Sequence, residues 1–152
     1  MRKNIVVLAL MCVVPSTIMA DNKIPEEILT VLENAEEIEL YSLDPTDDEA
    51  NPKELGKTVI KNAEDRKKLV AEFKKGVEEG DAAAKCFDPR HRIKAKHKDK
   101  TVDLVICFQC MQICCYVDGK KTKTLITTNK PQAYFDGVLK DAGVRLAPKP
   151  KE

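Results

Sequence analysis

The chain has 152 residues, with 26 lysines and arginines against 25 aspartates and glutamates, so its net charge is close to zero. This length suits one domain, and the balanced charge gives no general reason to bind nucleic acid or an anionic membrane surface. Charge is nonetheless segregated, because residues 21–56 are acidic and residues 90–100 are basic. The two stretches can pair with each other within the fold.

Residues 1–20 have the pattern of a secretory signal peptide, in which two basic residues precede a short apolar segment. That segment, 5–14, is shorter than the roughly 20 residues that span a bilayer, and Ala20 is a small residue suited to cleavage. A retained membrane anchor and lipid attachment at Cys12 are the alternatives. We therefore expect an exported protein, periplasmic, in the cell envelope or secreted, with residues 21–152 as one mature domain and no transmembrane anchor.

The first half of the mature domain predicts two helices and two strands. Apolar residues recur at helical spacing over 25–35 and 63–79, and both segments carry helix-start signals. Strands are expected at 38–43 and 55–60. An acidic loop with two prolines, 44–54, separates these strands.

The second half is richer in strands. Residues 101–117 predict either one long bent strand or two strands broken near Cys110, and a hairpin turn signal leads to a strand at 122–128. A final helix is expected over 131–143, followed by a frayed tail at 147–152. The whole order predicts an α+β domain, with an antiparallel sheet of about four to five strands packed against two to three helices.

Basic residues alternate with other residues over 90–100, which predicts a strand with one cationic face. This face is either a solvated sheet surface or an anion-binding stripe for an anionic envelope component or an acidic protein. The candidate anion-binding residues are Arg90, Arg92, Lys94 and Lys96. No aromatic residues interleave with them, so we expect no nucleic acid as a partner. The opposite face turns His91 and Ile93 toward the core.

Five cysteines lie in the mature domain, and export makes disulfide bonding their first expected use. Cys107 and Cys110 would point to opposite faces of a regular strand, so Cys86 is expected to pair with one of them. Such a bond closes a loop of roughly 20 residues and contributes about 3 kcal/mol of stability. The adjacent Cys114 and Cys115 are expected to pack, one facing the core and one facing out. An odd number of cysteines leaves at least one thiol unpaired.

A metal site is the alternative use of the same region. Four residues could surround a tetrahedral zinc ion: Cys86, His91, Cys107 and Cys110. A cysteine activated by His91 is a further alternative, although the sequence shows no third residue to orient the imidazole. The chain carries no nucleophile elbow and no phosphate loop, so we identify no catalytic residue and, zinc aside, no cofactor. We expect a non-catalytic binding or structural module of unknown ligand, stabilised by a disulfide involving Cys86.

Two segments carry a resemblance to a known family. They are Cys86-Phe87-Asp88-Pro89-Arg90-His91-Arg92-Ile93 and Thr101-Val102-Asp103-Leu104-Val105-Ile106-Cys107-Phe108-Gln109-Cys110. Together they resemble the core of a family of small exported bacterial proteins of unknown function, over roughly residues 38–148. The usual family form has a small residue in place of Arg92 and an acidic residue in place of Gln109. Cys114 and Cys115 stand outside the pattern, and the resemblance implies no activity.

Overall fold

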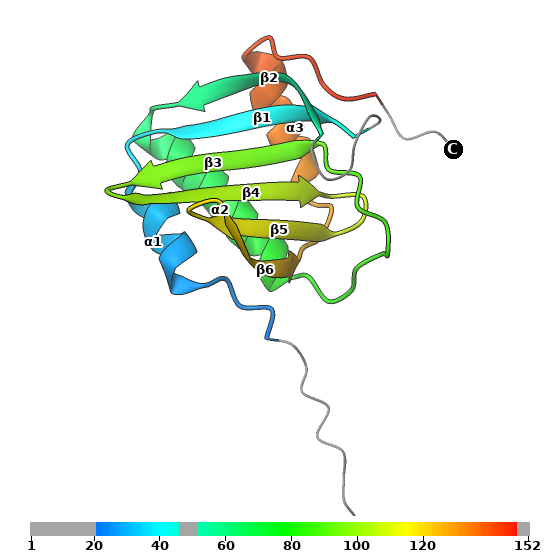
Figure 1. Cartoon of the computed structure of the whole chain (residues 1–152). Coiled ribbons are helices and arrows are strands. Elements are labelled where there is room, and N and C mark those ends of the chain that lie inside the picture. The colour runs from blue at the N-terminus through cyan, green and yellow to red at the C-terminus, as the bar shows by residue number, and fades with distance from the viewer. Residues whose placement is uncertain (1–20, 46–51, 149–152) are drawn as a thin grey trace, which may run out of the picture.

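Three helices and six strands follow one another in the computed structural model (Figure 1). The helices are α1 (Glu26–Asn34), α2 (Ala63–Glu78) and α3 (Gln132–Asp141). The strands are β1 (Ile38–Asp44), β2 (Lys53–Ile60), β3 (His91–His97), β4 (Lys100–Cys107), β5 (Gln112–Val117) and β6 (Lys120–Ile126). The structure describes residues 21–45 and 52–148. The expected leader at 1–20, most of the acidic loop and the end of the tail lie outside the described residues.

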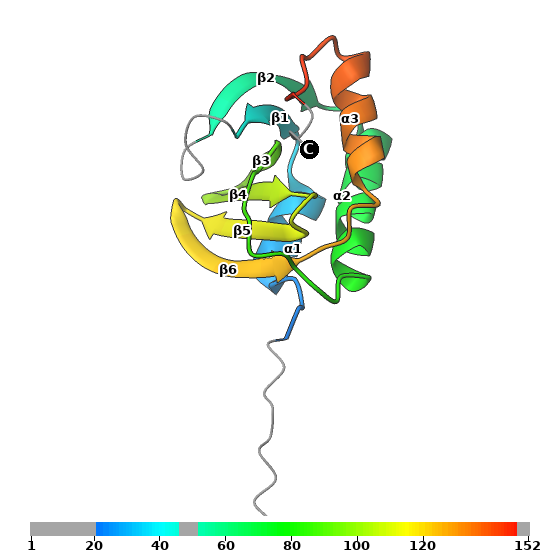
Figure 2. The ribbon, with the colours of Figure 1, turned by 90° about the vertical axis from the view of Figure 1, so that its right-hand side faces the viewer.

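All six strands join one antiparallel sheet in the order β2-β1-β3-β4-β5-β6. The helices pack on one face of this sheet, and Figure 2 shows α2 and α3 side by side on that face. The predicted α+β architecture is confirmed, whereas the predicted count of four to five strands is too low. In the described ranges, no helix has both the length and the apolar character that a membrane span requires.

The extra strand arises because the segment 101–117 breaks into a hairpin rather than running on as one bent strand. β4 ends at Cys107, and Met111 adopts a left-handed backbone conformation with φ of 56°. The Met111 amide donates to the carbonyl of Phe108 at 3.3 Å, which closes the turn. β5 then returns antiparallel, so that Ile113 lies opposite Ile106 and both are buried. The predicted break near Cys110 is therefore confirmed.

Strand alternation divides the buried side chains between the two faces of the sheet. The helix-covered face holds the main core, in which Leu40, Ile93 and Leu104 meet Phe73 of α2 and Phe135 of α3. The opposite face carries a smaller cluster, formed by Tyr41, Leu43, Val105 and Cys114 with Phe87 and Tyr116 at its margin. Burial on both faces fixes the register, because a one-residue slip would exchange the two sets of side chains.

Candidate functional site

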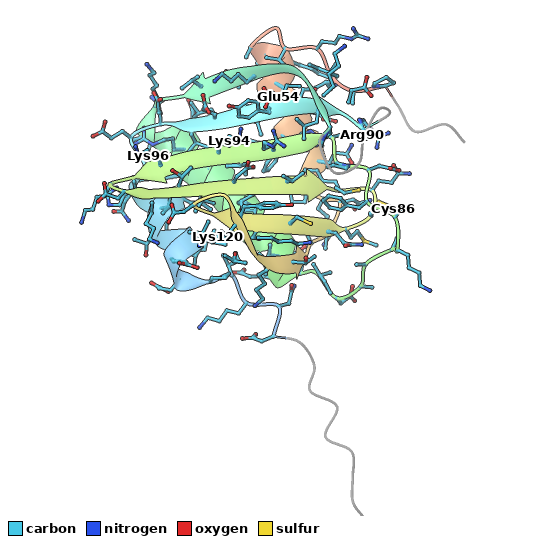
Figure 3. The ribbon with its side chains drawn as sticks, viewed as in Figure 1. Glu54, Cys86, Arg90, Lys94, Lys96 and Lys120 are labelled. Carbon is cyan, nitrogen blue, oxygen red and sulfur yellow. A yellow bond between two sulfur atoms is a disulfide. The ribbon has the colours of Figure 1, made fainter. Side chains whose placement is uncertain are left out.

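A disulfide joins Cys86 to Cys110, with their Cα atoms 5.7 Å apart. This is one of the two pairings that the sequence favours for Cys86. The bond attaches the segment between α2 and β3 to the turn between β4 and β5. Figure 3 places Cys86 and Arg90 at the same end of the sheet. The disulfide therefore stabilises the part of the molecule that the sequence identifies as the candidate site.

Among the described residues, three cysteines remain unpaired and buried, namely Cys107, Cys114 and Cys115. Cys115 lies in the main core, and burial raises the pKa of its thiol to about 12. Cys114 lies in the smaller cluster on the other face, so these two neighbours point to opposite sides of the sheet. Both thiols fill space in packed clusters.

His91 lies on the helix-covered face at the start of β3, where only 2% of its surface is exposed. Its Nε2 atom lies 2.9 Å from Oδ1 of Asp136 on α3, and its ring meets Phe108 and Phe135 edge to face. The carboxylate oxygen is an acceptor, so the imidazole carries a proton on Nε2. Nδ1 is buried and has no hydrogen-bond partner among the described residues.

Ser42 is the cross-strand neighbour of His91, since the two residues pair directly between β1 and β3. Its side chain is 1% exposed, and its Oγ atom likewise has no partner in the described part of the chain. A buried polar group without a partner costs about 1 to 3 kcal/mol. Among the described residues, Arg92 Nε and Asp103 Oδ1 also lack a hydrogen bond, but their opposite charges lie 3.4 Å apart. The Ser42 and His91 atoms have no such compensation, which indicates a site with an unfilled role.

Both of these polar atoms belong to residues that line one cavity of about 340 Å³. We call it the Ser42–His91 cavity; its other polar lining residues are Arg90, Gln132, Asp136 and Lys140. The C-terminal segment 146–148 closes one side. A second cavity of about 310 Å³ shares Arg90, His91 and Gln132 with the first. The start of β3, one side of α3 and the C-terminal segment thus meet around a polar hollow.

The four candidate anion-binding residues do not form one free stripe. Arg92 contacts Glu54 at 3.0 Å and Asp103 at 3.4 Å, and Lys94 lies 3.9 Å from Glu54 and over the ring of Tyr41. Lys96 continues this row toward the other end of β3 (Figure 3). These contacts leave little free cationic surface on Arg92 and Lys94.

Arg90 lies just before β3, at the Cys86 end of the sheet, whereas Lys94 and Lys96 lie further along the strand (Figure 3). Its guanidinium donates to the carbonyl of Pro148 at 3.2 Å and to Oε1 of Gln109 at 3.2 Å. Neither acceptor is a carboxylate, so the positive charge of Arg90 is not neutralised by these bonds. Arg90 is therefore the candidate whose charge is available to a ligand in the cavity.

The expected zinc ligands do not converge. Cys107 follows Ile106, which is the cross-strand partner of His91, so the Cys107 and His91 side chains point to opposite faces of the sheet. Cys86 and Cys110 are bonded to each other. Across residues 21–45 and 52–148, no three His, Cys, Asp or Glu side chains gather in a way that could hold a metal ion.

Sequence reasoning placed His91 and Arg90 in the site but missed the four residues that complete it, namely Ser42, Gln132, Asp136 and Lys140. A signal existed for Ser42, because it follows Ile38 and Leu40 in the inward-facing alternation of its strand. A signal also existed for Asp136, which is an acidic residue next to the buried Phe135 on an amphipathic helix. The contact between helix and strand could not be deduced from spacing alone.

Comparisons with models of protein families, with curated proteins and with solved structures give no match to this chain.

Proposed function

We propose that the protein is an exported, non-catalytic binding module that holds a small hydroxylated organic anion in the Ser42–His91 cavity. The observation that carries this proposal is the pair of buried polar atoms, Ser42 Oγ and His91 Nδ1, that lack partners in the described part of the chain and belong to residues lining one cavity. A ligand that bonds to both atoms removes the cost of leaving them unsatisfied. The signal-like leader supports export.

The charges around the cavity favour an anion. Arg90 and Lys140 contribute two positive charges, whereas Asp136 is the one carboxylate in the lining. Asp136 is already engaged by His91 through the 2.9 Å contact. A ligand carboxylate between Arg90 and Lys140 would restore the local balance, and a guanidinium matches the planar geometry of a carboxylate.

The imidazole adds a requirement for a hydrogen-bond donor on the ligand. His91 donates its Nε2 proton to Asp136, so Nδ1 of the neutral ring is an acceptor that a ligand hydroxyl can satisfy. Ser42 can donate to a ligand oxygen or accept from a ligand hydroxyl. The volume of about 340 Å³ lies near the lower end of the range for small-molecule sites, roughly 300 to 1,000 Å³. A small hydroxycarboxylate satisfies these requirements.

A binding role fits the site better than nucleophilic catalysis. Ser42 and His91 are neighbours, but within the described residues Ser42 Oγ has no hydrogen bond to the imidazole that would activate it. The disulfide at Cys86 lies four residues before Arg90 and fixes the segment that leads into β3. A site held rigidly in this way loses less free energy to ordering when a ligand binds.

The test is a titration of the mature protein with glycolate, lactate, malate and inorganic phosphate, followed by calorimetry and by amide chemical shifts. We expect at least one hydroxycarboxylate to bind and to shift amides of Ser42 and His91. Ser42→Ala and Lys140→Gln should each weaken that binding. Lys96→Gln removes the same charge at the other end of β3 and serves as the matched control, which should bind as the unmodified protein does.

Two outcomes contradict the proposal. One is the absence of binding by every member of the panel. The other is an equal loss of affinity in Lys140→Gln and Lys96→Gln, which would mean that the anion responds to the overall charge of the protein rather than to this cavity.

A further inference from the structure

Three cysteines are connected at the turn between β4 and β5, and only one of them is accessible: Cys86 is bonded to Cys110, whose backbone amide contacts Sγ of Cys107. Cys86 is exposed on the segment that precedes β3, whereas Cys107 and Cys110 have no exposed surface. The disulfide thus has one half in contact with water and one half in the interior. The third sulfur, on Cys107, belongs to an unpaired thiol.

The unpaired thiol lies beside the buried half of the disulfide. Sγ of Cys107 accepts a hydrogen bond from the backbone amide of Cys110 at 3.1 Å. The turn that follows, closed by the bond from Met111 to Phe108, holds Cys107 and Cys110 together. The two cysteines that a regular strand would separate are therefore brought together by the break between β4 and β5.

We propose that Cys107 is an internal exchange thiol, which transfers the disulfide from Cys86–Cys110 to Cys107–Cys110 and releases Cys86 as an exposed thiol. In this step the Cys107 thiol loses its proton, which the departing Sγ of Cys86 finally takes up, and the Cys107 sulfur attacks Sγ of Cys110. The bond between Cys110 and Cys86 breaks, and its electron pair leaves on Sγ of Cys86. One disulfide is broken and one is formed, so the exchange needs no external oxidant or reductant.

The environments of Cys107 and Cys86 explain why the exchange is slow and why Cys86 is the sulfur that leaves. Burial raises the pKa of the Cys107 thiol, so little of it is thiolate at any moment. The leaving sulfur of Cys86 departs into water beside Lys85, where a thiolate is better solvated than in the interior. The Cys86–Cys110 bond is the one present in the structure, and the slow attack by Cys107 preserves it.

The segment that carries Cys86 remains docked after the bond has moved. The Ala84 amide donates to the carbonyl of Cys110 at 3.0 Å, and the Gln112 side chain donates to the carbonyls of Ala84 and of Cys86. The released Cys86 is thus presented at a fixed place on the surface. Its partner class is a disulfide of a small molecule or of another exported protein, which Cys86 attacks to form a mixed disulfide while the partner's second sulfur leaves as thiolate.

The test uses oxidised glutathione and iodoacetamide on the native, oxidised protein, because neither reagent reacts with a cysteine that is already in a disulfide. After acid quenching and blocking of free thiols, trypsin separates residues 86–90 from residues 101–120, which contain the other four mature cysteines. We expect a modified 86–90 peptide together with a 101–120 peptide that has lost two hydrogens. Fragmentation should place the new bond between Cys107 and Cys110.

Matched variants connect this product to Cys107. Cys107→Ala should abolish modification of Cys86, whereas Cys114→Ala, which removes another buried thiol, should leave it unchanged. If Cys107→Ala does not fold, the peptide map of the unmodified protein still decides. A map in which Cys86 stays bonded to Cys110 after prolonged incubation overturns the proposal, and so does equal modification of Cys86 in Cys107→Ala.

Discussion

The start of strand β3, which we call the near end, and the middle of the strand carry similar residues in very different surroundings. In the middle, Arg92 and Lys94 lie beside carboxylates, and Arg92 approaches both Glu54 and Asp103. At the near end, Arg90 donates to a carbonyl and an amide oxygen only. The difference shows that alternation along a strand predicts which way a cation points but not whether its charge is compensated.

The near end also holds features that cost stability. Ser42 Oγ and His91 Nδ1 are buried without hydrogen-bond partners among the described residues, as Arg92 Nε and Asp103 Oδ1 are beside the middle of the strand. Only the near end also attaches an exposed cysteine, Cys86, to a buried one, Cys110. A fold tolerates such groups where they serve a purpose or where other bonds compensate. The disulfide is therefore expected to be the main stabiliser of the near end.

The largest expected effect follows from removal of the disulfide. Cys86→Ser should lower the free energy of unfolding by about 3 kcal/mol, because the bond between residues 86 and 110 restricts the unfolded chain. Urea denaturation measures this change. Amide hydrogen exchange should accelerate in residues 81–90 and remain unchanged at Lys94 and Lys96, which would locate the loss at the near end.

Reduction of the unmodified protein provides the control for this variant. A reductant should lower the unfolding midpoint of the unmodified protein and leave that of Cys86→Ser where it is. If the two proteins respond equally to the reductant, the bond contributes no stability, and the near end must be held by other contacts.

The second effect is smaller and of opposite sign. Ser42→Ala removes a buried hydroxyl that has no partner in the described residues, so we expect the free energy of unfolding to rise by about 1 kcal/mol. Thr122→Val is the matched control, because the Thr122 hydroxyl donates to the carbonyl of Cys115 at 3.3 Å and its loss should lower stability. A loss of stability in Ser42→Ala would mean that the hydroxyl is satisfied in solution and that the cavity has no unfilled donor.

Much of this molecule could be predicted from its sequence, since helical spacing and strand alternation depend on local chemistry. A helix-start signal was identified for 63–79, and in the structure Oδ1 of Asn62 accepts from the amides of Glu64 and Asp65. His91 was expected to face the core, and it does. The sequence left the sixth strand undecided. The break at Met111 depends on a left-handed backbone conformation, and this turn has no glycine that would have indicated one.

The candidate site was harder to predict because its parts come from distant segments. Asp136 lies 45 residues beyond His91, and their contact depends on how α3 crosses the sheet. The four candidate zinc ligands do not come together in the described structure, because Cys107 and His91 lie on neighbouring strands but face opposite ways. Parity along each strand was predictable, whereas the register between β3 and β4 was not, and register decides which side chains can share a ligand.

The smallest effect tests the charges beside the middle of β3, through the dependence of stability on pH. Burial raises the pKa of the Asp103 carboxyl, and the positive charges of Arg92 and Lys94 offset this only in part. Because the pKa in the folded state exceeds that in the unfolded state, the cost of the carboxylate is absent in acid and grows as pH rises through the folded-state value. Asp103→Asn should therefore be slightly more stable than the unmodified protein at neutral pH, and the difference should disappear in acid.

Asp118→Asn should show the opposite pH dependence. A hydrogen bond from the Thr101 amide, and then one from Lys100, lower the pKa of the Asp118 carboxyl, so its contribution is present at neutral pH and is lost as pH falls. Urea midpoints measured across the acid range compare the two variants. Parallel pH profiles would show that the Asp103 carboxylate is as well compensated as that of Asp118. The buried charge beside the middle of β3 would then not reduce stability.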